Sequence, residues 1–252
     1  LSLAKALRRL PEPLPDAVSQ MISLASPSTW DSLFAILPAG MRPRQAGDKL
    51  HKLAAVLAAD AGDYYRVLTS PWAEAWGLVN GTARPEFAPF AEAVRGRFKT
   101  ELAWMQYADM VTYLPDDVLT KVDRASMAVS LEARVPLLDH RVVEFAWRLP
   151  EEFKIRDGQG KSLLRQLLCK YVPKKLVERP KMGFGVPIDA WLRGPLKDWA
   201  SDLLDPDTMG QAGFLDPAPI HAKWAEHLSG RRDWQHFLWN VLMFEAWRRS
   251  VR

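Results

Sequence analysis

The chain has 252 residues, of which 48% are hydrophobic and 25% charged, an ordinary globular composition that argues against extensive disorder. Its 34 basic and 30 acidic residues are scattered and give a net charge of +4, without the dense basic stripe expected of a nucleic-acid-binding protein. No apolar run approaches the roughly 20 residues that span a bilayer, so we expect no membrane partner.

Helical periodicity dominates the first half of the chain. Apolar residues recur at helical spacing and predict one helix over about 48–59 and a longer one from residue 98 to near Pro115. Two Pro-rich stretches, 11–15 and 84–89, are expected to be loops.

Further helices are predicted after residue 115. The run Pro115-Asp116-Asp117 is typical of a helix start, because Asp carboxylates meet the free N–H groups there, and this helix should reach about Val129. Asp139 is expected to cap a helix to about residue 148. Gly160 should precede another helix, to about residue 171.

The C-terminal quarter is also predicted to be helical, over 220–228 and 234–249. The Asp-, Pro- and Gly-rich stretch 205–219 is expected to be a loop, and no alternating β-branched run of useful length predicts a strand. Four tryptophans are expected on the packed face of the last helices: Trp224, Trp234, Trp239 and Trp247. The fold class is therefore mostly α.

Two regions are expected, without a long linker between them: a variable helical region over residues 1–95 and a more constrained helical core over 96–252. The single cysteine, Cys169, cannot form an internal disulfide, which favours a reducing compartment, and we expect a cytoplasmic protein. Cys169 itself is expected to be a small buried hydrophobe in mid-helix. The five histidines follow no metal-binding spacing, so no metal ligand is predicted.

Three charged residues that look buried stand beside Pro and Gly between residues 130 and 185. They are Glu132 in L-E-A-R-V-P-L-L-D, Lys161 in G-K-S-L-L-R and Lys181 in R-P-K-M-G-F. If this carboxylate and the two lysines converge on one pocket, they suit a phosphate-bearing intermediate that is attacked by a nitrogen nucleophile.

Each of these residues also has a purely structural interpretation. Glu132 could form an ion pair with Arg134, and a lone lysine is usually solvated. In the K-V-D-R run that begins at Lys121, an i,i+4 pair with Asp117 would be worth only tenths of a kcal/mol. Gly160-Lys161 does not form a P-loop, because the glycine required five positions earlier is Ile155.

The three motifs together resemble the C-terminal synthetase domain of glutamine-dependent asparagine synthetases, most clearly over residues 98–191. The resemblance implies the helical C-terminal half of an α/β synthetase domain of the ATP-pyrophosphatase type. It implies that Glu132 assists ammonia attack, and that Lys161 and Lys181 neutralise pyrophosphate and an acyl-adenylate. Asp123 and Arg124 would help to shape the substrate site.

The same resemblance implies an amidotransferase that uses ATP and Mg²⁺ to adenylate the side-chain carboxylate of aspartate. Ammonia, released from glutamine, then displaces AMP to give asparagine. Aspartate and ammonia or glutamine are the implied partners, and a homodimer is compatible with the pattern.

Three features of the family are missing from the printed sequence: the S-G-G-x-D-S loop that holds pyrophosphate, a later acidic Gly-rich segment that binds nucleotide and metal, and an N-terminal Cys on a glutaminase domain. ATP and Mg²⁺ are therefore expected to be bound mainly by segments absent from this chain. The chain also begins with Leu1, so we expect a piece that lacks the ATP-binding loop and is inactive alone. Two alternatives stay open: a non-catalytic helical interaction domain, and a relative that forms a β-lactam or amidates a different carboxylate.

Overall fold

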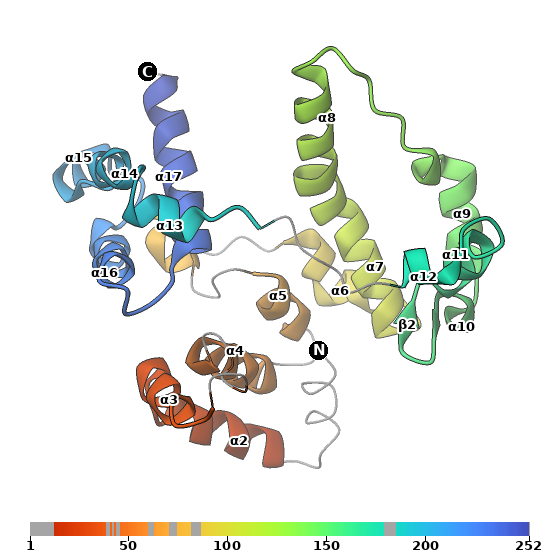
Figure 1. Cartoon of the computed structure of the whole chain (residues 1–252), viewed down its shortest axis with the longest axis horizontal. Helices are drawn as coiled ribbons and strands as arrows, with labels where there is room; N and C mark the ends of the chain where they lie inside the picture. Colours follow the sequence, from red (N-terminus) through yellow and green to blue (C-terminus); the bar gives the residue numbers. More distant parts are fainter. Residues whose placement is uncertain are drawn as a thin grey trace. The chain divides into compact units, whose positions relative to one another are not determined.

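The computed structural model describes residues 13–38, 41, 43, 46–59, 63–70, 75–81, 87–178 and 185–251. This part of the chain is mostly α-helical, which confirms the predicted fold class (Figure 1). None of its helices combines the length and the apolar character needed to cross a membrane.

The chain divides into two compact units. The outer unit consists of residues 1–111 together with 187–252, and the inserted unit consists of residues 112–186. The predicted domain boundary near residue 95 stays a prediction, because a compact set of contacts does not show which segment folds alone.

Among its described residues, the first helices of the outer unit are α2 (Leu14–Ser23), α3 (Pro27–Phe34), α4 (Ala46–Ala58) and α5 (Tyr64–Thr69). The predicted helix over 48–59 is confirmed by α4. The Ser19 hydroxyl donates a 2.9 Å hydrogen bond to the carbonyl of Ala54 and so links α2 to α4. A Cβ on Gly47 would overlap the carbonyl oxygen of Pro27, so only glycine lets α4 approach α3 this closely. Figure 1 shows α2, α3 and α4 side by side.

Short 3₁₀ turns, η2 (Ala75–Leu78) and η3 (Ala88–Phe90), and helix α6 (Glu92–Arg95) lead to α7 (Glu101–Val111). Helix α7 is the second predicted helix, although it begins three residues later than expected and ends at residue 111. Trp104 is fully buried, and its indole N–H donates to the carbonyl of Pro89 at 2.8 Å. The Tyr65 hydroxyl donates to Asp109 at 2.6 Å, and burial raises the pKa of Tyr65 further above its usual range.

The C-terminal part of the outer unit forms a packed core from five helices: α13 (Ile188–Arg193), α14 (Lys197–Leu203), α15 (Pro206–Ala212), α16 (Pro217–Leu228) and α17 (Gln235–Ser250). The predicted helices over 220–228 and 234–249 are confirmed by α16 and α17. Leu78 from the N-terminal segment joins this core, whose fully buried residues include Leu192, Ile220, Leu238 and Leu242. An antiparallel bridge between Val79 and Leu215 also ties the two segments together.

The prediction of a loop over 205–219 is wrong, because α15 and the start of α16 lie there. Two Asp-Pro pairs start these helices. Asp205 accepts a hydrogen bond from the Thr208 N–H at 2.9 Å, and Asp216 accepts one from Ala218 at 3.0 Å. Each following proline occupies a first-turn position, where no N–H is needed. Gly213, at φ 72°, ends α15 in the left-handed conformation.

His227 is buried in this core. Its Nδ1 accepts a hydrogen bond from the Trp234 N–H at 3.2 Å, and its carbonyl accepts one from Arg193 Nε at 2.7 Å. Burial, followed by the nearby Arg193 charge, lowers the pKa of His227 below its ordinary value of 6.5.

The described residues of the inserted unit, 112–178 and 185–186, form nine short elements. They are the π-helix η4 (Leu114–Leu119), α8 (Thr120–Met127), the 3₁₀ turn η5 (Pro136–Leu138), α9 (His140–Arg148), α10 (Glu151–Lys154), β1 (Ile155–Arg156), β2 (Gln159–Gly160), α11 (Ser162–Leu168) and α12 (Lys174–Val177). The predicted helix start at 115–117 is therefore a π-helical turn that continues into α8, and the helix ends at Met127, two residues short of the prediction.

The other predicted features of this unit have mixed outcomes. Asp139 caps α9 as predicted, with its carboxylate accepting from the Arg141 N–H at 2.9 Å. The Arg141 side chain, hydrogen-bonded to the same carboxylate, lowers the pKa of Asp139. The helix predicted after Gly160 is α11, which ends at Leu168. The β1–β2 hairpin was not predicted. Its turn, Asp157-Gly158 with φ of 51° and 74°, is a hairpin signal that could have revealed it.

Two predictions of burial are wrong. Cys169 follows the last residue of α11 and is exposed, because α11 ends a turn earlier than expected. Trp247 is 60% exposed near the end of α17, whereas Trp224 is buried and Trp234 and Trp239 pack against the core as expected.

Candidate functional site

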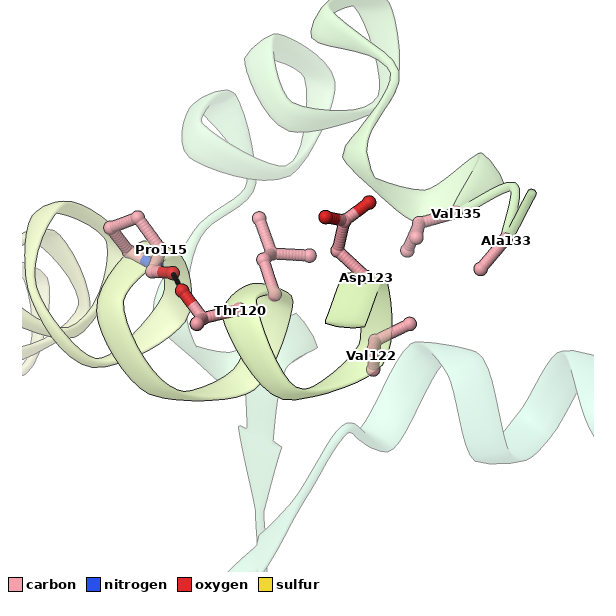
Figure 2. A pocket seen from close by; sticks show the side chains of 7 residues that line it. Pro115, Thr120, Val122, Asp123, Ala133 and Val135 are labelled. Carbon is pink, nitrogen blue, oxygen red and sulfur yellow. Dashed lines mark hydrogen bonds between the residues drawn. The ribbon is translucent and has the colours of Figure 1, made fainter. Parts of the chain in front are cut away.

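The pocket described in the inserted unit has a volume of about 410 Å³ and is lined by seven residues: Pro115, Leu119, Thr120, Val122, Asp123, Ala133 and Val135. Five of these come from one stretch, η4 and α8, and two come from the segment that follows α8 (Figure 2). Residues 115, 119 and 122 repeat at helical spacing, so they share one face. The pocket is thus a helical face opposite a short extended wall.

Asp123 contributes the only ionisable side chain among the seven lining residues. No ion pair or side-chain hydrogen bond engages its carboxylate within the described ranges, and only its main-chain carbonyl accepts, from Ser126 at 3.1 Å. The Thr120 hydroxyl donates across the π-helical turn to the carbonyl of Pro115 at 2.9 Å. Figure 2 shows the Asp123 carboxylate projecting from α8 on the side where Val135 lies.

The segment after α8 divides its side chains between two faces. Ala133 and Val135 line the pocket. Glu132 and Arg134 form an ion pair with each other at 2.9 Å, and neither of them lines the pocket. This alternation is that of an extended chain, in which successive side chains point to opposite sides. The structure therefore separates Glu132 from the pocket that Asp123 lines.

Glu132 does not have the buried surroundings that the sequence suggested. Its side chain is 67% exposed and that of Arg134 is 81% exposed, so the ion pair predicted as the structural alternative is present at the surface. Such exposed pairs contribute little to stability and exchange readily with solvent. A carboxylate of this kind is available to a new partner at small cost.

Arg124 and Lys121 are exposed, as are Val122 and Asp123 between them. Arg124 does not line the pocket, although Asp123 beside it does. Lys121 forms the predicted i,i+4 ion pair with Asp117 at 2.9 Å, and this hydrogen bond raises the pKa of Lys121. Of the two residues expected to shape a substrate site, only Asp123 therefore faces the pocket.

Lys161 is exposed and immediately precedes α11, in the position expected to open that helix. Its backbone is left-handed, with φ 61° and ψ 35°. Its carbonyl accepts the Arg165 N–H at 2.9 Å, which fixes the start of the helix. A residue with a Cβ is disfavoured in this conformation, and such residues gather at functional sites.

Three non-glycine residues of the described chain have positive φ: Ser130, Asp157 and Lys161. All three lie in the inserted unit. Asp157 is explained by its hairpin turn, whereas Ser130 precedes the segment of Glu132 and Lys161 precedes α11. The unusual backbone thus occurs beside two of the predicted site residues.

Lys181 lies outside the described residues, as does the rest of the R-P-K-M-G-F motif. Within the described ranges, no three His, Cys, Asp or Glu side chains come together in a way that could hold a metal ion.

The apolar pocket walls were not singled out from the sequence. The spacing of Pro115, Leu119 and Val122 gives a helical stripe, and this pattern ordinarily indicates a core face. Only the fold reveals that this stripe faces Ala133 and Val135 across an open pocket.

Comparison with known proteins identifies a family that this chain matches. A family model described as "Asparagine synthase" matches residues 4–249. A Mycobacterium bovis protein named "Putative asparagine synthetase (glutamine-hydrolyzing)" is 43% identical over 148 residues, which cover 58% of this chain and 22% of that protein. "Asparagine synthetase (glutamine-hydrolyzing) 1" of Bacillus subtilis is 36% identical over 148 residues, covering 57% and 22%.

A mammalian protein is also similar to this chain. The Mus musculus "Asparagine synthetase (glutamine-hydrolyzing)" is 32% identical over 152 residues, which cover 54% of this chain and 27% of that protein. The chain thus spans about a quarter or less of the length of these relatives. No solved structure matches significantly.

Proposed function

The chain belongs to the asparagine synthase family, and from that premise we propose that it forms the helical part of an ATP-dependent amidotransferase. In the proposed reaction, ATP activates the side-chain carboxylate of aspartate as an acyl-adenylate and releases pyrophosphate. Ammonia derived from glutamine then attacks the activated carbonyl, and AMP leaves as asparagine forms. The observation that carries this proposal is the family match over nearly the whole chain, together with the names of the relatives.

Glu132 is proposed as the residue that assists ammonia attack. A carboxylate that accepts a proton from the attacking nitrogen, or orients it, can contribute about 10²–10⁴-fold to the rate. The proposal is supported by its exposure and by its weak surface partner, because the ion pair with Arg134 holds the carboxylate without burying it.

Lys161 and Lys181 are proposed to neutralise the pyrophosphate and the acyl-adenylate. For Lys161, the left-handed backbone supports a role for the side chain, since glycine would satisfy the same turn without strain. Lys181 rests on its motif alone. Removing one such charge-stabilising contact typically lowers a rate by about 10²–10³-fold.

Asp123 and Arg124 are proposed to contribute to substrate binding. Asp123 has the better structural support, because it faces the pocket and carries that pocket's only ionisable group. ATP and Mg²⁺ belong to the proposed reaction of the whole enzyme. Since the described residues gather no cluster of metal-binding side chains, we assign none of them to Mg²⁺ and derive no step through it.

The test is a chimera. The segment of Bacillus subtilis asparagine synthetase 1 that aligns with this chain is replaced by this chain, and the product is assayed for asparagine, AMP and pyrophosphate with glutamine or ammonia. We expect synthesis in the chimera, with losses of about 10²-fold or more on Glu132→Gln and Lys181→Ala. Failure of a folded chimera to release pyrophosphate with aspartate would contradict the proposal.

The chain offers a matched control for the Glu132 variant. Glu144 also pairs with an arginine, Arg148, at 3.6 Å, and it too is exposed. Glu144→Gln therefore removes the same charge from the same kind of ion pair and should leave synthesis unchanged. If the chimera keeps full synthesis with both Glu132→Gln and Lys181→Ala, the chain acts as a non-catalytic helical scaffold instead.

A further inference from the structure

The pocket of Figure 2 combines an apolar wall with one carboxylate. Pro115, Leu119, Val122, Ala133 and Val135 provide hydrocarbon surface, and Asp123 provides the charge. No positively charged side chain lines the pocket, so an anionic ligand would find a like charge and no partner. The chemistry of the lining therefore favours a cation that also carries apolar surface.

The Asp123 carboxylate is ready to take such a partner. Within the described part of the chain no ion pair or side-chain hydrogen bond occupies it, unlike the nearby Asp117, which pairs with Lys121 at 2.9 Å. The Thr120 hydroxyl already donates its proton to the Pro115 carbonyl at 2.9 Å, which leaves its oxygen as an acceptor. Carboxylate and hydroxyl together offer acceptors only, which is what an ammonium group with its N–H donors requires.

The pocket has room for a molecule much larger than a bare ion. Its volume of about 410 Å³ is more than ten times the roughly 30 Å³ that a water-sized molecule occupies in the liquid. It falls instead within the range of about 300–1,000 Å³ that is usual for small-molecule sites.

We propose that this pocket binds a small organic molecule that bears a primary ammonium group on an apolar body, with Asp123 as the counter-ion. The ammonium lies at the Asp123 carboxylate, and the hydrocarbon part packs on Leu119, Val122 and Val135. This ligand is neither aspartate nor ATP, so the inference goes beyond the proposed function and gives Asp123 a partner of a different chemical class. Binding itself requires no nucleotide and is measured without synthesis.

Binding is tested on the full 252-residue chain by NMR titration of its backbone amide signals with cyclohexylammonium chloride. We expect saturable shifts confined to residues 115–123 and 133–135. Cyclohexanol has the same body without the charge and should bind about five-fold more weakly, the scale of one exposed ion pair. Cyclohexanecarboxylate should not bind.

Two variants separate the contact with Asp123 from a general charge effect. Asp123→Asn should weaken cyclohexylammonium binding by about five-fold. Asp116→Asn removes the same charge from the same helical stretch, at an exposed residue that does not line the pocket, and should leave binding unchanged. Ala133→Leu narrows the wall without changing the charge and should also weaken binding.

Several results would overturn the inference: no shifts in the pocket, equal binding of cyclohexanol, or equal losses from the Asp116 and Asp123 variants. Equal binding of ammonium chloride or aspartate would show that no apolar body is needed. An active chimera whose pocket binds no amine would refute this inference alone. A pocket that binds amine in an inactive chimera would refute only the proposed function.

Discussion

Residues 187–251 and the inserted unit are of similar size but distribute their apolar side chains in opposite ways. Fourteen of the 65 residues in the first region are buried, against one, Ser162, of the 69 described residues of the inserted unit. Large apolar side chains are exposed at six positions in the first and at 18 in the second. Apolar side chains thus build a core in the first region and stay largely exposed on the short helices of the second.

The difference explains where candidate chemistry lies. A packed core holds side chains in fixed positions and leaves little room for a ligand. The inserted unit instead contains the pocket, the exposed Glu132 and Lys161, and every non-glycine residue with positive φ in the described chain. Local contacts fix two parts of it: Asp139 caps α9, and the Asp157-Gly158 turn joins β1 to β2.

The largest expected effect tests the core directly. Leu242 is fully buried, and Leu242→Ala should lower the free energy of unfolding by about 2–5 kcal/mol through lost burial and a residual cavity. Leu167 in α11 is 49% exposed, and Leu167→Ala should cost less than about 1 kcal/mol. Urea unfolding of both variants provides the measurement. Equal losses would break the contrast and show that the apolar side of α11 is covered in solution.

The second effect concerns the backbone. Gly47→Ala should destabilise the chain by about 1–3 kcal/mol, because its Cβ would overlap the Pro27 carbonyl where α3 and α4 meet. Gly160→Ala in the inserted unit is the matched control, since a Cβ there has no neighbour within 4 Å. In thermal unfolding, Gly47→Ala should lower the midpoint temperature more than Gly160→Ala does. An unchanged midpoint in Gly47→Ala would mean that α3 and α4 are not so closely packed.

A smaller effect of opposite sign is expected at Lys161. Lys161→Gly should raise the free energy of unfolding by about 1 kcal/mol, because glycine relieves the left-handed strain. Lys161→Ala keeps that strain and should be nearly neutral. Both variants should lose synthesis in the chimera. A glycine variant that is stabilised and still fully active would remove Lys161 from the proposed site.

The smallest expected effect is a loss of stability on acidification that depends on His227. Because burial lowers the pKa of His227 in the folded protein, the unfolded chain binds more protons below pH 6.5. Stability from this residue is therefore complete above pH 6.5 and is lost as the pH falls towards the lowered pKa. The urea midpoint should decline between pH 7.5 and 5.5, less so in His227→Gln. His236→Gln, at an exposed position, should keep the wild-type decline.

The sequence predicted the longer helices, and α9 with its Asp139 cap, but not α15 or the hairpin. Helices α4, α16 and α17 are long and rich in apolar residues, which predicts them, whereas the Asp-Pro start and Gly213 end of α15 resemble turn residues and predict a loop. The hairpin at Asp157-Gly158 has strands of two residues, too short for an alternating pattern. Local composition does not distinguish a capped helix from a turn when both use the same residues.

The candidate site shows a different limit. The motifs identified Glu132, Lys161, Lys181 and Asp123, but periodicity could not show that Glu132 and Ala133 face opposite sides of one extended segment. Nor could it show that the stripe ending at Val122 faces a pocket rather than a core. Those facts depend on contacts between segments, which a one-dimensional pattern does not contain.

The bridge between Val79 and Leu215 has a consequence for synthesis on the ribosome. Leu215 is translated 136 residues after Val79, and at about 5–20 residues per second this delay lasts roughly 7 to 27 s. During that interval Leu78 has been made but its core partners have not. Leu78 and the bridge-forming backbone of Val79 therefore stay without their partners during this period, in which chaperones can bind them.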